Sequence, residues 1–327
     1  MKIPFLKPFI IGNLQFPINL IQGPLAGISC APFRFLTEKY SAPAFTYTEM
    51  ISCSSLLYQP QVIYQRYLKK IPGEGKVAVQ LAGSDPVILK QAVMQATDYG
   101  ADLIDLNCGC PVKKIRRKGS GSKLLTDPLK LFKLITAMKN NTHVPILIKI
   151  RIPEKTNEAF NFEIAKVIEE AGADCLIIHG RHWTEHYETP CQYEKIQFFV
   201  EALKIPVVGN GDIIDLKSFK NMAVTGCQGM MISRGSVGQP WFIRKLIAEI
   251  KNESFLSPSA SEIGLIWLQH VSLLAELLNN DYQALLQARK FSKYYARHLP
   301  NKAAFCEALN QCKNLSDLQK ISYLYFI

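Results

Sequence analysis

The chain has 327 residues, and 48% of them are hydrophobic, which excludes a disordered protein and suits one large domain with a smaller one. Lysine and arginine number 38 against 27 aspartates and glutamates, which gives a formal charge of +11. This excess favours a polyanionic partner, with nucleic acid ahead of a membrane surface.

The nine cysteines are odd in number and scattered along the chain. Residues 1–12 lack the charged start, long apolar run and small-residue cleavage site of a signal peptide. No stretch approaches the roughly 18 apolar residues that a membrane span needs. We therefore expect a cytoplasmic protein with reduced thiols and no membrane contact.

Short apolar runs rich in β-branched residues alternate with longer helical patterns. The expected strands cover residues 20–23, 44–48, 76–81, 103–107, 146–150, 175–179, 206–209 and 229–233. Near-continuous hydrophobic runs of this kind are typical of strands buried on both faces of a parallel sheet. Helices are expected between them, over residues 86–99, 128–140, 158–171 and 216–224 among others.

Eight βα units in about 240 residues predict a (β/α)₈ TIM barrel. An open doubly wound sheet is the alternative, but it usually has fewer strands and a glycine-rich fingerprint after the first one. Here the first expected strand is followed by Pro24-Leu25-Ala26-Gly27, which is not that fingerprint. The sequence therefore favours the barrel.

The composition changes to serine and proline over residues 255–261, which indicates a linker. Four helices are expected after it, over residues 263–278, 282–298, 302–312 and 316–325. We therefore predict a catalytic barrel over residues 1–253 and a C-terminal all-α helical domain over residues 254–327.

Polar or glycine-containing groups follow all eight expected strands, and active sites of this fold lie at the carboxyl ends of the strands. In chain order these groups are residues 24–27, Glu49, Gln80, residues 107–111, Lys149 with Arg151, His179 with Arg181, residues 210–212, and Arg234 with Gly235. We expect them to converge on one face of the barrel.

The glycine-bearing turns after the last two strands lie where this fold often binds phosphate, although Gly211 and Gly235 would also suit simple tight turns. A phosphate site favours a nucleotide-like cofactor, and flavin mononucleotide (FMN) fits. Gln80 and Asn107 are candidates to bind the edge of its ring. Lys149 would place positive charge near the part that gains electron density on reduction.

Cys110 follows the fourth strand within Asn-Cys-Gly-Cys-Pro. A thiol is ordinarily protonated at neutral pH, which suits a general acid that protonates carbon. Pairing with Cys108 in a metal site or a disulfide is the alternative, but metal sites commonly use wider spacing and a second pair. A single cysteine is ordinarily an inert buried thiol. Only the position of Cys110 after a strand end favours a catalytic role for it.

A basic run follows directly, with five cations over residues 113–118. Lys113 and Lys114 begin what we interpret as a basic loop beside a phosphodiester substrate, although most such runs are simply solvated. His179, His182 and His186 have no matching cysteine pair, so we predict no metal site. His179 lies at a strand end, where it is better placed to contact a cofactor or a phosphate.

In the helical part, Arg289, Lys293 and Arg297 are four residues apart and share one helix face. Tyr294, Tyr295 and His298 are interleaved with them. Cations and aromatic rings on one face suit contact with the RNA backbone and stacking on bases, whereas an ordinary exposed face is the alternative.

Taken in order, these motifs resemble the tRNA-dihydrouridine synthases, most closely the bacterial B-type branch, over nearly the whole chain. The segments that carry the resemblance are residues 11–13, 24–27, 32–34, 48–50, 79–86, 107–111 with 113–114, 149–151, 179–181, 210–212, 239–241 and 288–290. Leu25, Ser233 and Arg116 depart from the residues usual in that family.

The resemblance implies bound FMN, NADPH as electron donor, and D-loop uridines of tRNA as substrate. By position, the FMN ligands would be Pro24, Leu25, Ala26, Gln80, Lys149, Asn210, Gly211, Asp212, Ser233 and Arg234. Cys110 would protonate uracil C5 while a hydride reaches C6. We expect a monomer. The alternatives are a flavin barrel acting on a small molecule such as dihydroorotate, and a non-catalytic RNA-binding barrel.

Overall fold

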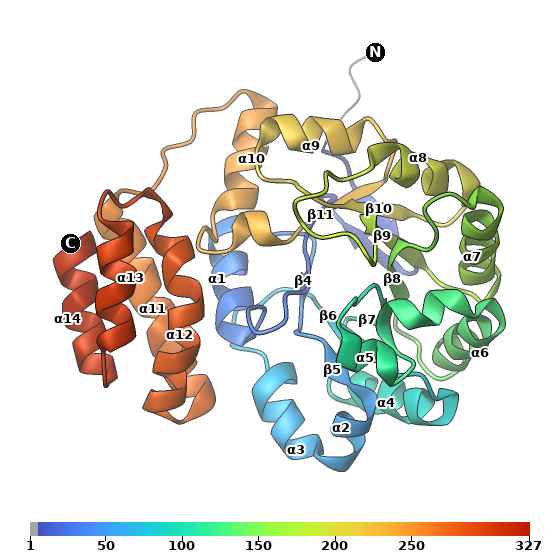
Figure 1. The fold of residues 1–327 in the computed structure, drawn as a ribbon, viewed down its shortest axis with the longest axis horizontal. Helices are drawn as coiled ribbons and strands as arrows, with labels where there is room; N and C mark the ends of the chain where they lie inside the picture. The colour runs from blue at the N-terminus through green and yellow to red at the C-terminus, as the bar shows by residue number, and fades with distance from the viewer. Residues whose placement is uncertain (1–5) are drawn as a thin grey trace.

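The computed structural model describes residues 6–327 and contains a parallel eight-stranded barrel (Figure 1). Its strands are β3 (Leu20–Gln22), β4 (Thr46–Tyr47), β6 (Val77–Ala82), β7 (Leu103–Cys108), β8 (Ile146–Ile152), β9 (Cys175–His182), β10 (Val207–Asn210) and β11 (Gly229–Ile232). Each overlaps one predicted strand, so the predicted TIM barrel is confirmed.

Backbone hydrogen bonds close the barrel between its first two strands. The N–H of Ala44 donates to the Leu20 carbonyl at 2.8 Å, and the N–H of Gln22 donates to the Phe45 carbonyl at 3.1 Å. The other strands pair in the order β3-β11-β10-β9-β8-β7-β6-β4, with the short strand β5 (Ile51–Ser52) extending beside β6.

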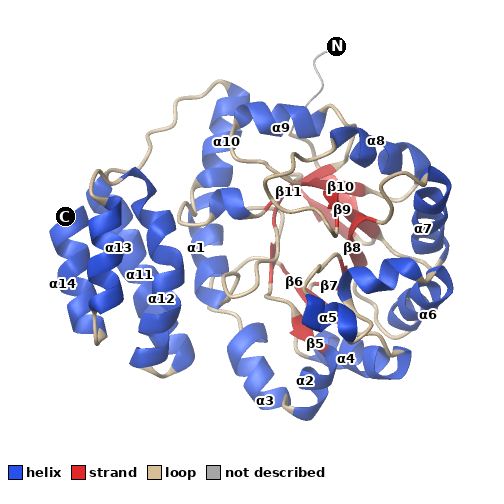
Figure 2. Cartoon of the chain, in the orientation of Figure 1, coloured by secondary structure: helices blue, strands red, loops and turns tan. Residues whose placement is uncertain are grey.

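Helices cover the outside of the barrel (Figure 2). They are α1 (Ala31–Ser41), α4 (Pro86–Asp98), α6 (Pro128–Lys139), α7 (Glu158–Glu170), α8 (Tyr193–Ala202), α9 (Leu216–Ala223) and α10 (Phe242–Lys251). Shorter helices are α2 (Cys53–Tyr58), α3 (Pro60–Ile63) and α5 (Lys113–Arg117). Asp85 and Asp127 cap α4 and α6, as their Asp-Pro pairs predicted.

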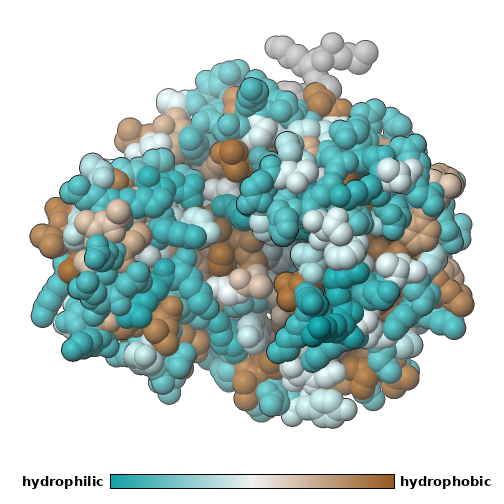
Figure 3. Space-filling view, in the orientation of Figure 1, coloured by the Kyte–Doolittle hydropathy of each residue, from teal (hydrophilic) through white to brown (hydrophobic). Residues whose placement is uncertain are grey.

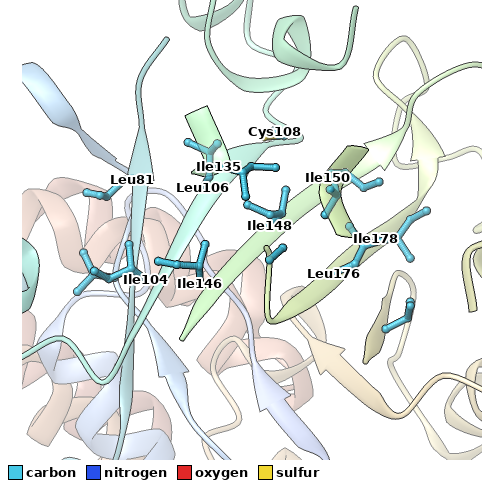
Figure 4. Packing of buried hydrophobic residues seen from close by; sticks show 14 of the residues in the cluster. Leu81, Ile104, Leu106, Cys108, Ile135, Ile146, Ile148, Ile150, Leu176 and Ile178 are labelled. Atoms are coloured by element: carbon cyan, nitrogen blue, oxygen red, sulfur yellow. The ribbon is translucent and has the colours of Figure 1, made fainter. Parts of the chain in front are cut away.

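Side chains along each barrel strand point alternately outward and inward, so they form one hydrophobic core between barrel and helices and another inside the barrel. Ile104, Leu106 and Cys108 of β7 belong to the cluster between barrel and helices that Figure 4 shows. Leu103 belongs to the cluster inside the barrel. Because the side chains of a strand alternate, Asp105 and Asn107 face the barrel interior with it.

A hairpin that the sequence interpretation missed is formed by β1 (Phe9–Ile11) and β2 (Leu14–Phe16). Phe9, Ile11 and Phe16 join the cluster inside the barrel, at the amino ends of the strands. Three-residue strands are too short to show a reliable alternation.

The C-terminal helices are α11 (Ala260–Leu278), α12 (Asp281–Tyr295), α13 (Lys302–Gln311) and α14 (Leu315–Phe326). They stand beside α1 and are joined to α10 by an extended segment (Figure 1). The predicted linker over residues 255–261 is too long at its end, because Ser259 and Glu262 form a capping box that starts α11 at Ala260. Along residues 6–327, no helix combines the length and apolar character needed to cross a membrane.

Candidate active site

A cavity of about 1010 Å³ opens at the carboxyl ends of the barrel strands. Its wall contains every residue predicted to bind the cofactor, namely Pro24, Leu25, Ala26, Gln80, Asn107, Lys149, His179, Asn210, Gly211, Asp212, Ser233 and Arg234. Cys110 lies in the same wall, and α12 contributes Lys293 and Tyr294. Figure 3 shows this face hollowed near its centre, with the strongly hydrophilic surface of α5 at one edge.

Two amide side chains line the barrel side of the cavity. Asn107 Nδ2 donates to Gln80 Oε1 at 2.9 Å, and Gln80 Nε2 donates to Asp105 Oδ2 at 2.7 Å. The strand register explains the second contact, because Gln80 lies opposite Asp105 in the pairing of β6 with β7. Each amide nitrogen carries a second N–H that can serve a bound ligand.

Lys149 extends from β8 into the barrel, where its Nζ donates to Asn210 Oδ1 at 2.9 Å. Burial lowers the pKa of Lys149, while the nearby carboxylate of Asp105 acts in the opposite direction. Burial likewise raises the pKa of Asp105. A partly buried ammonium in this wall can stabilise negative charge on a ligand.

His179 is buried, and desolvation lowers its pKa well below the ordinary value, with neighbouring cations adding to the effect. Its Nε2 lies 3.0 Å from Arg181 Nη1. A guanidinium only donates hydrogen bonds, so Nε2 is the acceptor and the proton of the neutral ring is on Nδ1. His179 therefore brings a neutral imidazole to the cavity.

Asp212 holds two arginines at the mouth of the cavity. Its carboxylate accepts from Arg181 Nη2 at 2.5 Å and from Arg234 Nη2 at 3.3 Å. The guanidinium of Arg234 lies 3.7 Å from the ring centroid of Tyr187, a cation–π contact. Tyr187 also lines the cavity, and no signal in the sequence singled it out.

The backbone of Cys110 is fixed at both ends. Its N–H donates to Asn107 Oδ1 at 2.9 Å, and its carbonyl accepts from Ser122 N–H at 3.1 Å and from Ser122 Oγ at 3.0 Å. The Cys110 side chain is partly exposed in the cavity wall, whereas Cys108 is buried against the helices. Both thiols are free, so the disulfide alternative does not describe this structure.

The basic run after β7 was expected to be a loop, but it forms the helix α5. Lys113 and Lys114 are exposed on it. Arg116 turns toward the segment after β9, where its guanidinium lies 3.4 Å from the ring centroid of Trp183. The run is therefore partly solvated and partly structural.

The three predicted RNA contacts on α12 have different environments. Lys293 is exposed at the cavity mouth. Arg297 lines the same mouth and donates to the Val237 carbonyl of the barrel. Arg289 is partly buried and donates to the Cys312 carbonyl at 2.7 Å, so its guanidinium stabilises the helical region.

The aromatic residues expected to stack on bases also differ. Tyr294 lines the cavity mouth and His298 is exposed. Tyr295 is only 3% exposed, and its hydroxyl lies 3.0 Å from His270 Nδ1. The interpretation of Tyr295 as an RNA-stacking residue is therefore wrong, since it belongs to the core of the helical region.

Histidine, cysteine and carboxylate side chains gather nowhere within residues 6–327 in a group of three or more that could hold a metal ion. The three histidines that the sequence analysis considered as metal ligands lie in different surroundings. His179 faces the cavity, His182 lies 2.7 Å from the Thr184 hydroxyl, and His186 is exposed.

A family model described as dihydrouridine synthase matches residues 21–324. With the barrel and its site, this match defines a flavin-dependent oxidoreductase. The chain belongs to the dihydrouridine synthase family, and the family expected from its motifs is confirmed.

Curated relatives match the chain over nearly their whole length. A tRNA-dihydrouridine synthase B from Vibrio parahaemolyticus is 33% identical, over 92% of this chain and 93% of its own. One from Proteus vulgaris is 32% identical, over 97% of this chain and 98% of its own. A probable tRNA-dihydrouridine synthase 1 from Synechocystis is 32% identical, over 95% and 87%.

Solved structures share the fold. A morphinone reductase mutant in complex with tetrahydroNAD superposes with a TM-score of 0.56 at 11% identity, covering 78% of this chain and 93% of that one. At this identity the likeness concerns the barrel architecture alone.

Proposed function

We propose that the chain reduces specific D-loop uridines of tRNA to dihydrouridine, with FMN as bound cofactor and NADPH as electron donor. We further propose that residues 1–253 act as the catalytic, FMN-binding barrel and residues 254–327 as a tRNA-binding helical domain. The observation that carries the proposal is the position of Cys110, whose side chain lines the same cavity as all the proposed FMN ligands.

The turn after β11 suits the phosphate of FMN. A Cβ on Gly235 would lie 2.4 Å from the Ile213 carbonyl oxygen, so only glycine fits this close approach of two loops. Arg234 adds a guanidinium at the same turn, and Ser233 and Gly211 line the neighbouring wall. Convergent backbone N–H groups and a guanidinium are the donors that phosphate groups prefer in proteins.

The polar groups deeper in the cavity suit the flavin ring. Gln80 and Asn107 would hydrogen-bond its polar edge, and Lys149 would stabilise the negative charge that the ring gains on reduction. The neutral His179 would present its Nδ1–H as a further donor. The remaining contacts would come from Pro24, Leu25, Ala26, Asn210 and Asp212.

Bound reduced FMN would supply a hydride to uracil C6. Cys110 completes the reduction by donating its thiol proton to C5, so that one hydride and one proton saturate the double bond. Arg151 lines the same cavity as Cys110, and its guanidinium would offset the negative charge that proton transfer leaves on the sulfur. Water or solvent acid then returns the proton.

Cations on both sides of the mouth would receive the tRNA backbone. Lys113 and Lys114 lie on α5, and Lys293 and Arg297 lie on or just after α12. Affinity for tRNA is then expected to fall with salt. A uracil must leave its stack to enter the cavity, which costs a few kcal/mol and favours loop nucleotides.

The first test is the visible spectrum of the purified protein, followed by anaerobic addition of NADPH and mapping of dihydrouridine in tRNA. Flavin bands at ~450 nm that bleach, together with new dihydrouridine in the D-loop, are expected. A colourless protein that takes up no FMN would overturn the proposed cofactor. If NADPH bleaches the flavin but free pyrimidines are reduced in preference to tRNA, a small-molecule oxidoreductase would be favoured.

We predict that Cys110→Ala loses nearly all turnover and keeps the flavin spectrum, because the proton donor is removed and the proposed ring contacts stay. Single-turnover reduction of tRNA by the pre-reduced variant measures this directly. Cys306→Ala, which changes another partly exposed thiol on α13, is the matched control and should turn over normally. Full activity of Cys110→Ala would remove the cysteine from the mechanism.

A further inference from the structure

Asp105 is a buried carboxylate beneath the cavity that the proposed mechanism does not use. It is the central inward-facing residue of β7 and is 0% exposed. It does not belong to the cavity wall, whereas Gln80 and Asn107, its neighbours in the barrel interior, do. Burial of a carboxyl group is unfavourable unless the group is hydrogen-bonded. The hydrogen bonds of Asp105 therefore indicate its role.

Three hydrogen bonds join Asp105 to the backbone of Cys110. Gln80 Nε2 donates to Asp105 at 2.7 Å, and Asn107 Nδ2 donates to Gln80 Oε1 at 2.9 Å. Asn107 Oδ1 in turn accepts the N–H of Cys110 at 2.9 Å and that of Gly109 at 3.2 Å. The series runs from the fully buried middle of the barrel to the partly exposed cysteine at its mouth.

The chemistry of the two ends fixes the orientation of both amides. The carboxyl group of Asp105 keeps an acceptor oxygen in either protonation state, so Gln80 can turn its NH₂ toward Asp105 and its oxygen toward Asn107. A backbone N–H only donates, so Asn107 must turn its oxygen toward Cys110 and its NH₂ toward Gln80. The two requirements agree, so neither amide can flip without leaving a buried polar group unpaired.

We propose that Asp105 is a positioning residue for the reaction, which orients Gln80 and Asn107 and through them holds the Cys110 segment in place. The proposal rests on the proposed role of Cys110 as proton donor. It assigns Asp105 no contact with cofactor or substrate. A displacement of about 1 Å at a reacting group can cost about 100-fold in rate, so a positioning residue at this distance has a measurable effect.

The test compares Asp105→Leu with Asp105→Asn in the purified full-length protein. Leucine removes the acceptor, whereas asparagine can keep an oxygen toward Gln80. The first readout is the alkylation rate of Cys110 relative to Cys306 in the same molecule, measured by peptide mass spectrometry. The second is kcat and KM for tRNA. Asp102→Asn, just before the start of β7, is the matched control. Asp102 accepts a hydrogen bond from Lys70 Nζ at 2.5 Å and has no part in the series that leads to Cys110.

We expect Asp105→Leu to change the Cys110-to-Cys306 alkylation ratio severalfold and to lower kcat by about 100-fold, with KM unchanged. Asp105→Asn should restore the alkylation ratio and most of kcat, and Asp102→Asn should match the wild type in both. If Asp105→Leu does not fold, Gln80→Leu breaks the same series of hydrogen bonds while the Asp105 side chain stays in place, and it should change the alkylation ratio in the same direction.

An unchanged alkylation ratio in Asp105→Leu or Gln80→Leu would overturn the proposal, and so would an Asp105→Asn variant as impaired as Asp105→Leu. The alkylation ratio reports the position of Cys110 whether or not the thiol is the proton donor. Failure of the proton-donor role therefore appears as activity in Cys110→Ala, and failure of the present inference appears as an alkylation ratio that does not move.

Discussion

His270 lies in the core of the helical region, where burial lowers its pKa to about 3. In the unfolded chain the same side chain titrates near 6.5, so below that pH protons bind the unfolded chain and not the folded one. The stability that neutral His270 contributes is therefore complete above pH 6.5 and is lost progressively as the pH falls toward 3.

We expect His270→Leu to make the protein less sensitive to acid. Between about pH 7.5 and about pH 5, its free energy of unfolding should fall by about 2 kcal/mol less than that of the wild type. Denaturant unfolding at the two pH values measures this change in the free energy of unfolding for each protein. The contributions of His179 and His182 cancel in the comparison, because both proteins contain them. Leucine at the exposed His143 is the matched control. Identical pH dependence of wild type and His270→Leu would contradict the assignment.

Single residues of the candidate site were predictable where their position follows from topology. The carboxyl ends of all barrel strands meet at one face, so a residue that follows a strand, such as Lys149 or Asn210, must lie near the cavity. Asp105 was not predicted, because a sequence does not tell which polar side chain a neighbouring strand will bring to it. Tyr187 was not predicted, because the path of an irregular segment depends on contacts such as that with Arg234.

At the scale of elements, the eight barrel strands were predicted because each is a distinct apolar run. Helix α5 and the hairpin β1–β2 were not, because each is shorter than the repeat that periodicity needs. Arg116 of α5 illustrates the consequence. Its guanidinium stacks on Trp183 and its Nη1 donates to Ser122 Oγ at 2.8 Å, the same hydroxyl that donates to the Cys110 carbonyl.

We predict that Arg116→Ala loosens the segment from Cys110 to Ser122 and slows the reaction. The cation–π contact with Trp183 contributes about 1 kcal/mol. Removal of the Arg116 side chain also removes the donor that orients the Ser122 hydroxyl. Hydrogen exchange over residues 110–122 should become faster, and kcat should fall more than KM for tRNA rises. Arg117→Ala removes the exposed neighbouring charge and should change KM alone. Equal effects of the two variants would mean that Arg116 acts only as a surface charge.

At the scale of the whole molecule, the helical region and the barrel share one hydrophobic cluster. It joins Phe33 of α1 and Trp241 before α10 to Trp267 and Phe291 of the helical region. The sequence predicted the helices and a linker, but the composition of a linker carries no information on whether the parts that it joins pack together. The predicted boundary at residues 253 and 254 falls in the extended segment between α10 and α11.

Gly238 allows the barrel and α12 to approach closely. Its φ is +72°, and a Cβ there would lie 2.5 Å from the carbonyl carbon of Tyr294. We predict that Gly238→Ala displaces α12, which raises KM for tRNA and lowers the melting temperature while the flavin spectrum is kept. Gly100→Ala is the matched control, because its φ is +82° with nothing within 4 Å of the added Cβ.

Both variants pay the strain of a left-handed alanine, about 1–2 kcal/mol, so only the steric effect differs between them. Thermal unfolding and steady-state kinetics with tRNA separate the two. A KM that rises equally in Gly100→Ala and Gly238→Ala would show that the contact with α12 does not matter for tRNA.

The shared cluster also bears on how such chains can recombine. Helix α1 follows the first barrel strand in the chain, yet it packs beside helices that come more than 200 residues later. A chimera that exchanged only residues 254–327 would set Phe33 and Trp241 against a foreign surface. A transfer of the helical region between relatives therefore has to include α1 and the turn before α10, because all three contribute to one hydrophobic cluster.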